Sequence, residues 1–157
     1  LGHEKTAALY EYSAGDLTFA LSAGQIEDLD GLATNDDAYS IAVKYAPSNY
    51  SVALGYETAG DVDHIALGAS ATFGAATVKF VASDVDVAGD PTQYALSLDY
   101  KVDAATFTVF ATDEGDINNY GIGASYDLGG GAKVVGGVVR DDAASNTMAD
   151  IGLSFSF

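Results

Sequence analysis

The sequence MADIGLSFSF at residues 148–157 decides the fold, because apolar and polar residues alternate along it. Successive side chains of a β-strand point to opposite faces, so this segment would be apolar on one face and polar on the other. In a soluble protein an unpaired apolar edge strand promotes aggregation. In a membrane β-barrel both edges are paired and lipid covers the apolar face. The segment therefore predicts one strand of an antiparallel transmembrane β-barrel.

The composition supports this prediction and excludes other classes. Hydrophobic residues make up 48% of the 157 residues, yet no window approaches the roughly 20 consecutive apolar residues of a transmembrane helix. The 23 acidic residues outnumber the six Lys and Arg, giving a net charge of -17. Nucleic acids and other anionic surfaces are therefore poor partners. Cysteine is absent, which excludes disulfides and thiol chemistry.

Two-residue alternation recurs along the whole chain, whereas helical periodicity is nearly absent. It predicts an all-β protein whose strands are about nine or ten residues long, the length that a tilted strand needs to cross a bilayer. The eleven predicted strands are residues 5–13, 17–26, 38–46, 50–58, 64–73, 76–83, 93–102, 105–112, 119–127, 132–140 and 147–157.

The connections between these strands alternate in character. Short turns of small residues are predicted at 14–16, 47–49, 74–75, 103–104 and 128–131, and longer acidic loops at 27–37, 59–63, 84–92, 113–118 and 141–146. Bacterial outer-membrane barrels have short periplasmic turns and longer extracellular loops. By this parity the C-terminus is periplasmic and the acidic loops face the exterior. An antiparallel sandwich with irregular loops is the alternative.

Tyrosines mark the two edges of the predicted apolar band. Four predicted strands each carry two tyrosines six residues apart on one face. Six residues rise about 20 Å, and strand tilt reduces this to roughly 15 Å of height. A tyrosine ring favours acyl chains while its hydroxyl favours water and headgroups. The predicted membrane-interface residues are Tyr39, Tyr45, Tyr50, Tyr56, Tyr94, Tyr100, Tyr120, Tyr126, Phe155 and Phe157.

The opposite face of the strands is small or polar, which favours a water-filled lumen over a packed interior. Opposed charges across a narrow pore would bias the choice of ions. By parity the pore-lining candidates are Glu11, Lys44, Lys79, Asp99, Lys101, Asp127, Lys133 and Asp150. In the alternative interpretation, Asp99, Lys101, Asp127 and Lys133 lie near the periplasmic rim and merely solvate it.

The acidic loops are candidates for calcium binding. Carboxylates at Asp28, Asp30, Asp36 and Asp37 would suit a hard cation such as Ca²⁺. The segment 28–31 lacks the rest of an EF-hand loop, so solvated loops are the alternative. Divalent ions could also bridge loop carboxylates to lipopolysaccharide phosphates. No cofactor is otherwise expected.

No catalytic constellation is present, so the sequence does not predict an enzyme. His3 and His64 have no serine nearby in a nucleophile-elbow context. Residues 68–72 miss the last glycine of G-x-S-x-G. The glycines of residues 121–123 lack the third glycine and the following helix of a dinucleotide fingerprint.

Several segments resemble the general-diffusion porins of alphaproteobacteria. They are LYEYSAG at residues 9–15, NYSVALGYE at 49–57, YGIGASYDLGGGAKVVGG at 120–137 and ADIGLSFSF at 149–157. The resemblance implies passive diffusion of small hydrophilic solutes and ions across the outer membrane of a Gram-negative bacterium. It also implies a homotrimer of sixteen-stranded barrels. Because eleven strands is an odd number, we expect residues 1–157 to be the C-terminal portion of one barrel domain, without the first strands and the constriction loop.

Two other functions remain open from the sequence. The chain could be a secreted or surface β-sandwich adhesin with acidic, Ca²⁺-binding loops, which would be soluble without detergent. It could also belong to a smaller, specific channel rather than a general pore. In the porin interpretation, the partners are outer-membrane lipid, lipopolysaccharide and two further copies of the chain. The faces around Gly136 and Ala149 are the expected trimer contact, or else part of the lipid face.

Overall fold

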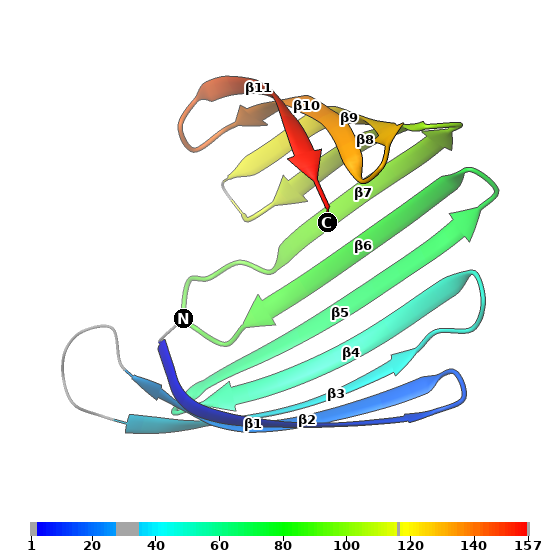
Figure 1. Cartoon of the computed structure of the whole chain (residues 1–157). Helices are drawn as coiled ribbons and strands as arrows, with labels where there is room; N and C mark the ends of the chain where they lie inside the picture. Colours follow the sequence, from blue (N-terminus) through cyan, green and yellow to red (C-terminus); the bar gives the residue numbers. More distant parts are fainter. Residues whose placement is uncertain (1–2, 28–34, 116, 157) are drawn as a thin grey trace. The chain divides into compact units, whose positions relative to one another are not determined.

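The computed structural model describes residues 3–27, 35–115 and 117–156. These residues form eleven antiparallel strands whose order in the sheet follows their order in the chain (Figure 1). No helix long and apolar enough to cross a membrane is found in this part of the chain. The strands are β1 (His3–Ala14), β2 (Leu17–Glu27), β3 (Asn35–Tyr45), β4 (Tyr50–Ala59), β5 (Val62–Phe73), β6 (Ala76–Val85), β7 (Gln93–Val102), β8 (Ala105–Asp113), β9 (Asn118–Gly129), β10 (Ala132–Asp141) and β11 (Asn146–Phe155).

The chain divides into two compact units. The first unit comprises Leu1–Ala69 and Ala82–Thr92, and thus contains β1 to β4 with parts of β5 and β6. The second comprises Ser70–Val81 and Gln93–Phe157, and thus contains β7 to β11 with the remaining parts of β5 and β6.

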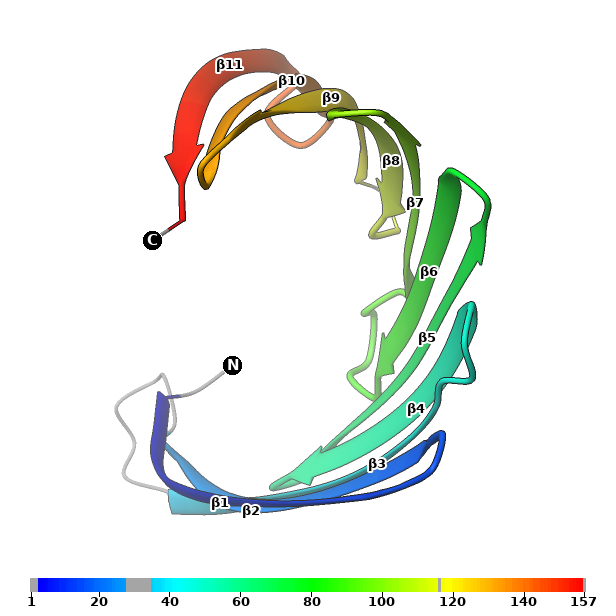
Figure 2. The ribbon, with the colours of Figure 1, turned by 45° about the vertical axis from the view of Figure 1, so that its right-hand side comes forward.

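The strand register of the first unit sorts its side chains into an apolar and a polar face. Tyr10, Leu21, Ile41 and Tyr56 are successive cross-strand partners on β1 to β4 and form one apolar row. The next row contains Glu11, Ala20, Ala42 and Gly55 and lies on the opposite face. A register shift of one residue would exchange the two faces, so the alternating pattern fixes the pairing. Figure 2 shows β1, β2 and β3 side by side.

The second unit repeats this division on β7 to β11. One row contains Leu98, Val109, Ile122, Val138 and Ala149 and is apolar. The adjacent row contains Asp99, Thr108, Gly123, Gly137 and Asp150 and is polar or small. The same two-residue pattern therefore gives the same two faces in both units.

On β4, β7 and β9 the apolar face is the more exposed face. In β4, β7 and β9, exposed side chains alternate with half-buried ones, and the exposed positions carry the Tyr, Leu, Ile and Val residues. No hydrophobic side chain is buried among residues 7–25, 37–115 and 117–156. The described residues thus lack the packed core that a soluble β-sandwich requires.

The predicted strands are confirmed, with corrections at several ends. β3 begins at Asn35 rather than residue 38, β5 begins at Val62 rather than residue 64, and β11 ends at Phe155 rather than residue 157. The acidic start of β3 pairs with the end of β2, as Asp37 with Gln25. Backbone hydrogen bonds form regardless of side-chain polarity, so apolar alternation cannot reveal such polar extensions.

The expected long loop at 59–63 is wrong. β4 and β5 are joined by a two-residue turn, Gly60-Asp61, which is shorter than the four-residue connection between β3 and β4. Gly60 has a φ of 58°, and a glycine with positive φ is the residue that two-residue hairpins favour. Strict alternation of short turns and long loops therefore fails at this hairpin.

Candidate functional site: the polar face of the strands

In the first unit the polar face carries small side chains, hydroxyls and two predicted pore-lining charges. Ser22 and Ser40 are cross-strand partners whose hydroxyl oxygens lie 2.7 Å apart in a hydrogen bond. Glu11 lies opposite Ala20 on β2, and Lys44 lies between Thr18 and Ala53. Small neighbours leave both charged side chains exposed to water.

In the second unit an ion pair crosses from β6 to β7. Lys79 Nζ donates a hydrogen bond of 2.8 Å to Asp99 Oδ2, and Thr108 Oγ1 donates one of 2.6 Å to Asp99 Oδ1. Both carboxylate oxygens therefore have a donor, and the Asp99 side chain is 25% exposed against 55% for Lys79. Asp99 thus has two protein partners in addition to any water, and whether it lies near a rim stays a prediction. Asp150 occupies the same row on β11.

Lys101, Asp127 and Lys133 lie together at the short-turn end of this face. Lys133 is the cross-strand partner of Asp127, and all three residues line one hollow of about 100 Å³. Asp127 Oδ1 accepts a hydrogen bond of 2.8 Å from the backbone N–H of Gly129 in the adjoining turn. This position agrees with the alternative that places these three residues near a rim.

Sequence reasoning missed apolar side chains on the polar face. Phe110 is the cross-strand partner of both Ser97 and Gly121. A Cβ added at Gly121 would lie 2.6 Å from the Phe110 ring and 2.9 Å from the carbonyl oxygen of Val138, so the ring covers the glycine. The parity of Phe110 with Thr106 and Thr108 was the available signal. Leu9, opposite Ser22, is a second such residue.

The predicted membrane-interface tyrosines all lie exposed on the apolar face. Two hydroxyls reach carboxylates near the strand ends: Tyr56 Oη donates to Asp63 Oδ1 at 2.8 Å, and Tyr39 Oη donates to Asp37 Oδ2 at 3.3 Å. The Tyr45 and Tyr50 rings meet edge to face with centroids 6.1 Å apart. Phe155 is also exposed, and Phe157 lies outside the described residues.

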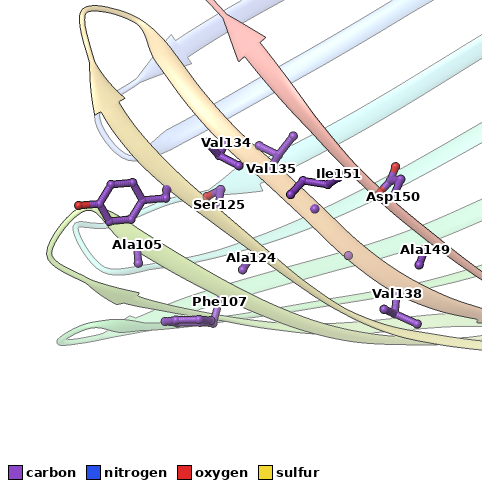
Figure 3. A pocket seen from close by; sticks show the side chains of 13 residues that line it. Ala105, Phe107, Ala124, Ser125, Val134, Val135, Val138, Ala149, Asp150 and Ile151 are labelled. Atoms are coloured by element: carbon purple, nitrogen blue, oxygen red, sulfur yellow. The ribbon is translucent and has the colours of Figure 1, made fainter.

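The apolar face of β8 to β11 contains a hollow of about 500 Å³ (Figure 3). Phe107, Ala124 and Val138 line it from β8, β9 and β10, and Ala149 and Gly136 are also in its lining. The hollow exists because small residues occupy adjacent positions where the rest of this face carries rings and branched chains. It contains both residues expected at a subunit contact.

No group of three or more His, Asp or Glu side chains that could hold a metal ion occurs within the described residues. Of the expected Ca²⁺ ligands, Asp28, Asp30 and the side chain of Asp36 lie outside the described part of the chain. Asp37 is exposed and accepts the Tyr39 hydroxyl. The calcium site therefore stays a prediction.

Comparison with known proteins gives a consistent result. A family model described as Gram-negative porin matches residues 2–146. A porin of Rhodobacter capsulatus is 36% identical, over 95% of this chain and 60% of the relative, and a porin of Fuscovulum blasticum is 32% identical, over 88% and 39%. The chain thus spans 60% of the length of the first of these relatives and 39% of the second.

Solved structures show the same similarity. A mutant of Rh. blastica porin matches with a TM-score of 0.81 at 29% identity, over 96% of this chain and 55% of that one. A porin refined at 1.8 Å resolution matches with a TM-score of 0.77 at 31% identity, over 95% and 60%. These matches agree with the observed all-β, antiparallel architecture.

Proposed function

Because the chain belongs to the Gram-negative porin family, we propose that it forms part of the wall of a passive diffusion channel. The channel would pass small hydrophilic solutes and ions across the outer membrane. The observation that carries this proposal is the division into two faces in both units, with the large apolar side chains on the exposed face. A lipid bilayer covers such a face and leaves the polar face to water.

The charged residues of the polar face would tune which ions pass. The Lys79–Asp99 pair is self-compensating, because each charge has its partner at 2.8 Å. Glu11, Lys44 and Asp150 form no ion pair with other described residues, so their fields extend further into the adjacent water. We assign them the larger influence on selectivity.

The orientation and the partners are also part of the proposal. The short turns and the C-terminus would face the periplasm, and the acidic segments would face the exterior near lipopolysaccharide. A homotrimer would use the hollow on β8 to β11, because small residues such as Ala124, Gly136 and Ala149 allow a neighbouring wall to approach closely.

Conductance across a planar lipid bilayer tests the function. We expect the purified protein to insert from detergent and to give discrete, ohmic current steps in potassium chloride. Far-UV circular dichroism would verify that the sample is β-structured. A folded sample of the complete barrel to which this chain contributes its strands would refute the channel if it added no conductance. A folded sample that stays soluble without detergent would favour the sandwich adhesin instead.

A further inference from the structure

A polar hollow lies at the short-turn end of the polar face in the second unit. The register places Thr106 opposite both Lys101 and Ser125, so two hydroxyl-bearing residues lie side by side on β8 and β9. Lys101 on β7 and Lys133 on β10 flank them. The complete lining of this hollow of about 100 Å³ is Lys101, Asp103, Ala104, Thr106, Ser125, Asp127 and Lys133.

Neither lysine of the hollow forms an ion pair with another described residue, in contrast to Lys79. Lys133 is directly opposite Asp127, but Asp127 Oδ1 already accepts the backbone N–H of Gly129. Lys101 lies opposite a threonine rather than a carboxylate. Both ammonium groups therefore line one small space, and neither has a carboxylate within ion-pair distance among the described residues.

The size and donors of the hollow define what it can bind. About 100 Å³ holds roughly three water molecules at about 30 Å³ each, which is the size of one carboxylate or phosphate group. The ammonium groups donate only, and the hydroxyls of Thr106 and Ser125 can donate as well. Such a set of donors matches an anionic group. The carboxylates of Asp103 and Asp127 repel a bound anionic group and so shorten the time that it stays bound. A conducting pore requires such brief binding.

We propose that this hollow binds the anionic group, carboxylate or phosphate, of a small solute at the short-turn mouth of the channel. Its part in passage rests on the proposed function, but the binding itself does not require conduction. The binding is weak, and its affinity rises or falls with the charges of Lys101, Lys133 and Asp127.

Titration of the detergent-solubilised protein tests the site by NMR. Inorganic phosphate, acetate and sodium chloride are added in separate experiments at equal ionic strength. We expect the backbone amide signals of Thr106 and Ser125 to shift to saturation with phosphate, with acetate or with both, and chloride to give only a small linear drift. The anion whose titration saturates at the lower concentration is the preferred ligand.

Three variants give the decisive comparison. Lys101→Gln and Lys133→Gln each weaken binding by about fivefold, the upper range for one exposed ion pair. Asp127→Asn tightens it by a similar factor, because an opposing charge is removed while the amide oxygen keeps the bond to Gly129. Lys44→Gln, in the other unit, leaves the affinity unchanged.

The outcomes separate this site from the channel function. Shifts that chloride reproduces, an equal loss with Lys44→Gln, or weaker binding in Asp127→Asn would each overturn the anion site. If a lysine variant does not fold, the sign of the Asp127→Asn effect still decides. If the protein conducts but shows no saturable shift, the anion site is refuted and the proposed function stands.

Discussion

Replacing Ile122 with arginine distinguishes a sheet face that contacts lipid from one that contacts water. Ile122 is 58% exposed and lies on the apolar face between Tyr120 and Tyr126. It is two residues, or about 7 Å along the strand, from the nearer tyrosine. In water, a substitution at so exposed a site changes the free energy of unfolding by about 0.5 kcal/mol or less. On the lipid face near the middle of a bilayer, arginine costs about 2–4 kcal/mol.

We therefore expect Ile122→Arg to lower the free energy of unfolding by about 2–4 kcal/mol in phospholipid vesicles, or roughly 30- to 1,000-fold in the folding equilibrium. Unfolding by urea is followed by far-UV circular dichroism, since the chain has no tryptophan. Ser97→Arg is the control, because Ser97 lies on the polar face beside Phe110. A loss below about 0.5 kcal/mol for Ile122→Arg, or an equal loss for Ser97→Arg, would show that the two faces are assigned wrongly.

Further predictions concern charge, close packing and calcium. Lys44→Glu should raise the cation preference, and an unchanged reversal potential in a salt gradient would contradict this. Gly136→Ala places a Cβ 2.9 Å from the carbonyl oxygen of Asp150 and should cost about 1–3 kcal/mol, whereas Gly152→Ala meets nothing within 4 Å and should be neutral in the same unfolding assay. A double-mutant cycle on the Lys79 ion pair should give a coupling of about 0.2–1 kcal/mol, since the pair is partly exposed; a larger value would mean that it is desolvated. Calorimetric titration should detect Ca²⁺ binding if the four loop aspartates form a site, and the absence of heat would remove that prediction.

The fold could be predicted because strand alternation reports directly on the two environments of the wall. At residues 93–102 the predicted strand matches β7 at both ends, since Leu96, Leu98 and Tyr100 alternate with small or charged residues throughout. The predicted strands at residues 38 and 64 began too late, because β3 begins at Asn35 and β5 at Val62. There the strands extend beyond the apolar band, so no alternation in hydrophobicity marks these extensions as strand.

The faces of the candidate residues could also be predicted, but their partners could not. Parity placed Lys79 and Asp99 on the polar face, yet their contact depends on the register between two strands. The Thr108 hydroxyl bond to Asp99 likewise requires the β7–β8 pairing. Phe110 shows the converse, because its parity with Thr108 places it on the polar face although a phenylalanine ring is expected on the apolar one.

The lack of any buried hydrophobic side chain in the described residues bears on how the molecule acquires its structure. Most proteins collapse because water expels their apolar groups into an interior, but here that gain is available only when acyl chains replace water around the sheet. Backbone amides must be paired before they enter hydrocarbon, so we expect strand pairing and insertion to proceed as one event. Until then the newly synthesised chain would need a chaperone that shields its alternating apolar residues from water.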